Sequence, residues 1–144
     1  MKLSLGVRTT SGTDATAAWE ILTGSTPGRA KIMEIGIFLA AATASVFGIG
    51  RPAATGVTPT SAVNLLPEDP NDVIAAGVVR SALAWGTGPT VPTGFLRRIS
   101  LPATIGTGVI FSFPQGLVIP VSSSIVLWNL STNAVVDCYA VVEI

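Results

Sequence analysis

The segment GVIFSFPQGLVIPVSSSIVLWN, residues 108–129, contains no charged side chain. It lies within an uncharged run from Ile99 to Val136, which is more than a quarter of the chain. A membrane-spanning helix needs about 20 consecutive apolar residues, but three prolines and three consecutive serines interrupt this run. Short apolar runs that end at Pro, Gly or Ser are typical of β-strands. The segment therefore predicts strands, and it sets the fold class expected for the whole chain.

Runs of the same kind recur along the chain and predict eight or nine strands. Helix signals are scarce, so the pattern is typical of an all-β sandwich or barrel. We expect one antiparallel β-sandwich domain over residues 1–144. Residues 1–15 are a candidate N-terminal arm. Residues 55–72 contain three prolines, and we expect them to form a long loop with at most one short turn of helix. The predicted strands lie near Leu3–Thr9, Thr16–Leu22, Ala30–Ala41, Val46–Arg51, Ala75–Trp85, Leu96–Leu101, Val109–Phe113, Ser124–Leu130 and Ala134–Glu143.

Two of the predicted strands are apolar on both faces, since strand side chains point to opposite sides in turn. Cover is therefore needed on both sides, from the second sheet on one and from a loop or a partner subunit on the other. In AKIMEIGIFLAA, residues 30–41, the alternation separates Ile32, Glu34, Gly36 and Phe38 from Lys31, Met33, Ile35, Ile37 and Leu39. In SSSIVLWNL, residues 122–130, it separates Ile125, Leu127 and Asn129 from Val126, Trp128 and Leu130.

Charge is the unusual feature of the composition. Charged residues make up 11% of the chain, against about 25% in typical proteins. Eight acidic and eight basic residues cancel, so net repulsion does not keep copies apart. We expect other protein to cover much of the surface. The balance also argues against nucleic-acid binding, which needs a basic surface. The first ten residues, MKLSLGVRTT, lack the apolar segment of a secretory signal.

The chain has no histidine, which excludes Ser-His-Asp and Cys-His nucleophiles and histidine-ligated metal centres. We therefore expect no enzymatic activity, no catalytic residues and no cofactor. GIGRPA, residues 48–53, matches a dinucleotide-binding pattern, but Pro52 and the residues after it do not continue as the helix that this motif requires. Cys138 is the only cysteine, and its apolar neighbours predict a buried thiol.

Acidic residues offer only weak candidates for binding or catalysis. PEDPND, residues 67–72, contains three carboxylates but lacks the spacing of a calcium loop, and a solvated turn is the simpler interpretation. We expect no metal there. A pair of carboxylates for glycoside hydrolysis would have to come from scattered positions without a local signature. The acidic residues in question are Glu68, Asp69 and Asp72 of the loop, and Glu20, Glu34, Asp137 and Glu143 elsewhere.

Arginines and tryptophans are the remaining candidates for contacts. Arg97 and Arg98 are the only adjacent basic pair. The planar guanidinium suits interface carboxylates and carbonyls, so these two residues and Arg51 are candidate subunit or capsid contacts, although a solvated strand edge explains them equally well. Tryptophans on apolar strands are more often core anchors than a platform for stacking sugars. The three tryptophans are Trp19, Trp85 and Trp128.

From about Ala30 to Val142 the chain resembles the small jelly-roll decoration (cement) or minor head proteins of tailed bacteriophages. The resemblance rests on EIGIFLAAATAS (34–45), GIGRPAATGVTPT (48–60), RRISLPATIGTGVIFSFPQGLVIP (97–120) and LWN (127–129). It implies a jelly-roll-like sandwich without an active site that binds the outer surface of an assembled capsid. It further implies a homotrimer, or less often a dimer, assembled in the bacterial cytoplasm and located on the virion exterior, with itself and the major capsid protein as partners and no membrane association.

Three other function classes remain as alternatives. A carbohydrate- or receptor-binding β-sandwich module of a phage fibre or head fibre would expose tryptophans beside Asn, Asp or Gln. A trimeric signalling or recognition head would share the apolar strands but usually follows a stalk or a secretory signal. A small hydrolase is the third class, and the missing histidine argues against it.

Overall fold

The computed structural model describes residues 1–25 and 29–144, and the secondary structure in these ranges consists of thirteen β-strands. No helix in this part of the chain is long and apolar enough to cross a membrane. The strands are β1 (Lys2–Arg8), β2 (Thr16–Thr23), β3 (Ala30–Leu39), β4 (Ser45–Gly50), β5 (Val57–Thr60), β6 (Val63–Asn64), β7 (Leu66–Pro67), β8 (Val79–Ala82), β9 (Ala84–Thr87), β10 (Arg97–Leu101), β11 (Gly108–Ile119), β12 (Ser124–Asn129) and β13 (Val136–Glu143).

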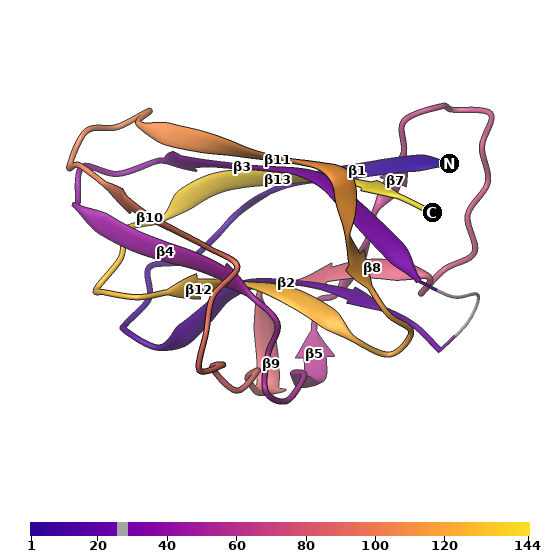
Figure 1. The fold of residues 1–144 in the computed structure, drawn as a ribbon, viewed down its shortest axis with the longest axis horizontal. Helices are drawn as coiled ribbons and strands as arrows, with labels where there is room; N and C mark the ends of the chain where they lie inside the picture. The colour runs from indigo at the N-terminus through magenta and orange to yellow at the C-terminus, as the bar shows by residue number, and fades with distance from the viewer. Residues whose placement is uncertain (26–28) are drawn as a thin grey trace.

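Two antiparallel sheets pack face to face as two layers of a sandwich (Figure 1). The five-stranded sheet has the order β11-β3-β13-β1-β7, and the six-stranded sheet has the order β10-β4-β12-β2-β8-β6. The eight longest strands divide equally between the layers, with β11, β3, β13 and β1 in one and β10, β4, β12 and β2 in the other, which is the double-sheet arrangement of a jelly roll. The predicted all-β, jelly-roll-like sandwich is confirmed, with eight principal strands.

The five additional strands all lie between β4 and β10. The prediction of a long loop over residues 55–72 is wrong in part, because β5, β6 and β7 form there and no helical turn does. β5 pairs with β9 in a separate two-stranded sheet, which lies beyond the six-stranded layer in Figure 1. β6 and β7 extend one edge of each main sheet, and Leu65 between them is buried in the core.

Residues 1–15 do not form an arm that leaves the sandwich. β1 lies between β13 and β7 and pairs with β13 along its whole length, from Lys2 opposite Glu143 to Arg8 opposite Asp137. Leu3 is fully buried in the core. The alternating pattern of this strand is therefore enough to place it in the sheet.

A β-bulge in β3 changes the faces predicted from strict alternation. Val141 lies opposite Glu34 and Val142 opposite Ile32, which leaves Met33 without a partner in β13. A bulge adds one residue and so reverses the side to which the preceding residues point. As a result Ile32 joins Ile35 in the core, and the prediction that Ile32 shares a face with Glu34 is wrong.

The central strand β12 is buried on both faces by the chain itself. Ile125 and Leu127 belong to the core between the sheets, whereas Trp128 lies outside that cluster and is still 0% exposed. The segment before β10 covers this outer side: the Phe95 ring lies against Gly48 on the neighbouring strand β4. The predicted two-sided burial of residues 122–130 is thus confirmed, and a loop provides the cover.

Candidate functional site

The three candidate contact arginines lie together at the β10 edge of the six-stranded sheet. Arg97 and Arg98 are on β10, and Arg51 directly follows its partner strand β4. All three are exposed. The Arg97 guanidinium stands 5.2 Å from the ring centroid of Phe113, and its Nη1 donates a hydrogen bond of 2.8 Å to the Leu96 carbonyl. None of them forms an ion pair with a described residue.

A groove of about 260 Å³ lies beside Arg97. It forms because the pairing of β11 with β3 is interrupted between Ser112 and Leu117. Gly116, at φ 74°, takes a backbone conformation that favours glycine, and Phe113 is turned inward to 7% exposure. The groove is lined by Leu96, Arg97, Phe113, Pro114, Gln115, Gly116 and Leu117. Arg97 is the one charged residue among the described residues that line this groove.

The outer face of the five-stranded sheet is not covered by a further layer of strands, and it contains a hollow of about 440 Å³ beside Gly6, Phe38 and Tyr139. Gly6, Tyr139, Gly36 and Ile110 are neighbours in one row across four strands. A Cβ on Gly36 would lie 2.1 Å from Tyr139 Cε1, so the tyrosine ring lies directly on the glycine backbone. The Phe38 ring covers Gly108 in the same way. Ile110 is 52% exposed, and the centre of this face is apolar.

Charged groups lie along this open face. Arg8 and Asp137 form a two-bond ion pair, with Nε to Oδ1 at 2.6 Å and Nη2 to Oδ2 at 2.8 Å. The hydrogen bond from Arg8 lowers the pKa of Asp137 and raises that of Arg8. The Tyr139 hydroxyl donates to Glu34, which raises the pKa of Tyr139 because the bond favours the protonated phenol. These contacts hold the tyrosine ring in place beside its charged neighbour.

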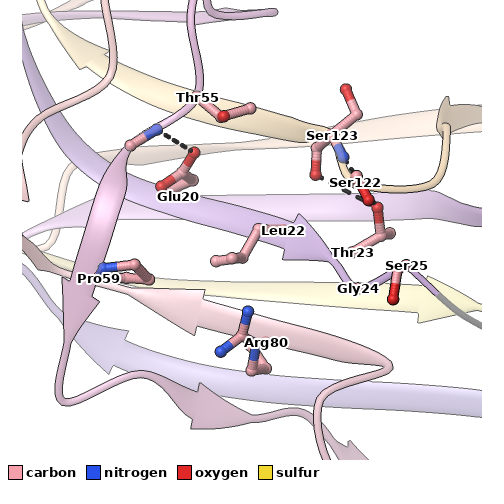
Figure 2. Close-up of a pocket in the computed structure, with 11 residues that line it drawn as sticks. Glu20, Leu22, Thr23, Gly24, Ser25, Thr55, Pro59, Arg80, Ser122 and Ser123 are labelled. Carbon is pink, nitrogen blue, oxygen red and sulfur yellow. Dashed lines mark hydrogen bonds between the residues drawn. The ribbon is translucent and has the colours of Figure 1, made fainter.

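On the other sheet, the Glu20 carboxylate is buried beneath the segments that contain β5 and β9. Glu20 is 1% exposed and accepts hydrogen bonds from Trp85 Nε1 at 2.6 Å, Ser124 Oγ at 2.7 Å and the Gly56 amide at 3.3 Å. We call the two-stranded sheet formed by β5 and β9 the arm. Glu20 therefore ties both sides of the arm to the sandwich, and Figure 2 draws one of the hydrogen bonds that it accepts as a dashed line.

The remaining sequence candidates are not assembled into a site. No group of three Asp, Glu or Cys residues gathers within the ranges 1–25 and 29–144, and Asp69 Oδ1 accepts bonds from its neighbour Asn71 in a turn. Trp19 and Trp128 are buried, as predicted for core anchors, and Trp85 is half-buried against Glu20. The buried position predicted for Cys138 is confirmed.

Sequence reasoning named Glu20 only among several scattered acidic residues, and it did not single out Arg80. Each is a single charged residue in an otherwise apolar strand, AAWEIL and VVRSAL, and such a residue has to find polar partners or remain at the surface. That signal was present in the sequence. The partners of Glu20 were not apparent, because Gly56, Trp85 and Ser124 lie 36 to 104 residues away along the chain.

A comparison of the chain with family models, with curated proteins and with solved structures found no match.

Proposed function

We propose that this protein is a non-enzymatic decoration (cement) protein that binds the outer surface of a tailed-phage capsid and stabilises the shell. The observation that carries the proposal is the open face of the five-stranded sheet. Its counterpart on the six-stranded sheet is covered by the chain's own loops, whereas Phe38, Ile110 and Tyr139 are left accessible on this face. Accessible apolar side chains next to charged ones are typical of a protein interface.

The function requires no chemistry, only differential binding. A protein that binds the assembled shell but not its dissociated subunits shifts the equilibrium toward the shell. Many copies then act together, so that modest contacts of each copy add up over the capsid. Within this proposal the partners are the major capsid protein and further copies of this chain, as a trimer in preference to a dimer. The protein is assembled in the bacterial host cytoplasm and resides on the capsid exterior.

The test is binding of purified protein to capsids of the virus that encodes it. Ile110→Lys places a charge in the middle of the open face, and capsid occupancy should fall at least tenfold because the buried lysine would lack a partner. Val73→Lys is the matched control, since Val73 is 88% exposed on a loop, and it should bind like the wild type. Equal occupancy for both variants would remove the open face from the proposal. Absence of wild-type binding to those capsids would refute the function itself.

A carbohydrate-binding role is the second candidate, and one observation favours it. The Tyr139 ring lies flat on Gly36 with its hydroxyl on Glu34, and aromatic faces beside a carboxylate suit the stacking of a sugar. NMR titration with oligosaccharides of the host surface tests it. Saturable shifts at Tyr139 that are lost in Tyr139→Ala would favour this candidate over capsid binding.

A further inference from the structure

A polar groove of about 280 Å³ opens on the six-stranded sheet next to the arm. It is lined by two charged residues, Glu20 from β2 and Arg80 from β8. The strands are paired so that Leu22 lies opposite Arg80 and Glu20 opposite Ala82. Glu20 and Arg80 are therefore diagonal neighbours, and Figure 2 shows Leu22 between them. Hydroxyl side chains of Thr55, Ser122 and Ser123 line other parts of the groove.

The positive charge of Arg80 is not paired with a carboxylate of the described residues. Arg80 is only partly exposed, and it forms no ion pair with any described residue. Residues 26–28 are Thr, Pro and Gly, so they contain no carboxylate that could complete one. The Nε atom is buried and has no acceptor among the described residues. The guanidinium therefore lacks an ion-pair partner and, at Nε, a hydrogen-bond acceptor among the described residues, and an unsatisfied buried donor is uncommon in native proteins.

Glu20 restricts what that partner can be. Both of its oxygens already accept hydrogen bonds from the protein, and the side chain is 1% exposed, so a ligand has little access to them. The carboxylate still places a negative charge beside the groove, which disfavours an anion with two or more charges more strongly than one with a single charge. The planar guanidinium of Arg80 matches a carboxylate. The neighbouring hydroxyls donate and accept hydrogen bonds, which suits hydroxyl or amide groups on the same ligand.

We propose that this groove binds a singly charged carboxylate through the terminal nitrogens of Arg80. The ligand carries hydroxyl or amide groups that reach Thr55, Ser122 or Ser123. Two sources offer this chemistry: an acidic side chain of another protein, and a sugar acid. The site does not depend on the capsid proposal, because it can be tested with the isolated protein.

The experiment is an NMR titration of labelled protein with sodium acetate, with chloride keeping the ionic strength constant. The Arg80 Nε–H signal and the Trp85 indole signal should shift in a saturable manner, whereas neutral acetamide should leave them unchanged. Loss of a charge-assisted hydrogen bond should weaken acetate binding by roughly tenfold or more in Arg80→Gln. Lys2→Gln removes one exposed charge from the other sheet and should bind acetate normally. Shifts that chloride reproduces, or that persist in Arg80→Gln, would overturn the site.

Further measurements identify the source of the carboxylate and provide a control for misfolding of the variants. Tighter binding of the α-amide of N-acetylglutamate, which carries a single carboxylate, than of acetate would indicate a protein side chain, and tighter binding of glucuronate would indicate a sugar acid. Inorganic phosphate should bind more weakly than acetate, and the reverse order would overturn the assigned ligand class. Arg80→Lys keeps the charge but lacks the planar fork, so it should retain weakened binding. If Arg80→Gln does not fold, weakened acetate binding in a folded Arg80→Lys variant would still support the site, and unchanged affinity would contradict the role of the fork.

Discussion

At the scale of single residues, most buried polar side chains have a hydrogen-bond partner, and Trp19 Nε1 and Arg80 Nε are the exceptions among the described residues. Asn133 shows this at the corner after β12, where its amide donates to the Val46 carbonyl at 2.7 Å and its oxygen accepts from the Val46 amide at 2.9 Å. Such side-chain bonds replace the strand pairing that ends at this corner. Cys138 is the contrasting case, because its thiol is buried at 3% exposure among apolar side chains.

Because the Cys138 thiol is buried, the free energy of unfolding should fall at alkaline pH. Burial, and to a lesser degree the nearby charge of Asp137, raises the pKa of the thiol to about 12. Because the unfolded thiol ionises near its ordinary value of 9.0, the unfolded state loses its proton first. The contribution of this group is fully present below that value and is lost as the pH rises toward the folded pKa. Urea unfolding from about pH 8 to pH 10 should therefore show a steeper loss for the wild type than for Cys138→Ala. Parallel curves would contradict the burial of the thiol.

At the scale of elements, the arm covers part of the outer face of the six-stranded sheet, where Glu20 is buried. Trp85 on β9 and Gly56 next to β5 both donate to Glu20, and β5 pairs with β9 through Pro59 opposite Trp85. The arm is thereby tied at both strands to one buried carboxylate. Its own two-stranded sheet is too small to be stable alone, so we infer that its position depends on this attachment.

Replacing Trp85 with Ala should loosen the arm. The change leaves one Glu20 oxygen without its donor and removes a half-buried ring, so the free energy of unfolding should fall by about 2 to 4 kcal/mol. Hydrogen exchange at the Gly56 amide should accelerate, which reports the arm directly. Val57→Ala is the matched control, because Val57 lies on β5 and is 58% exposed, and it should change stability by less than about 0.5 kcal/mol. Similar losses in both variants would refute the attachment through Glu20.

At the scale of the whole molecule, a single copy of the chain forms a compact fold. Its accessible surface is 6868 Å², close to the roughly 6,900 Å² expected for a compact monomer of this mass. The apolar sequence is therefore largely accounted for by the sandwich and its own covering loops. Association, if the capsid proposal holds, joins copies that are already folded, and light scattering at micromolar concentration should give a trimer, or less often a dimer.

The arginines at the β10 edge provide the test at this scale. Changing Arg97 and Arg98 together to Ala should lower capsid occupancy. The melting temperature should stay within a few degrees, because exposed side chains contribute little to stability and the Arg97–Phe113 contact is worth about 0.5 to 1 kcal/mol. Binding assays beside thermal unfolding of the isolated protein separate the two effects. Wild-type occupancy in the double variant would exclude these arginines as capsid contacts.

The sequence alone determined the fold class and the position of most strands. Alternating apolar residues and Pro, Gly and Ser boundaries act over a few neighbours, so the uncharged segment 108–129 was enough to predict strands there. It also indicated that β12 is buried on both faces. Single charged residues inside apolar strands, Glu20 and Arg80, were visible as exceptions even though their partners were not.

The tertiary structure decided what depends on contacts between distant parts of the chain. The bulge at Met33 changes which residues of β3 enter the core, and it arises from pairing with β13 rather than from β3 itself. The cover over Trp128 comes from residues near Phe95, and the donors to Glu20 come from three separate segments. Which sheet face stays open, and where an unpaired arginine lines a groove, follow from these long-range contacts. Local sequence periodicity carries no information about such contacts, because it reports only the side to which each residue points.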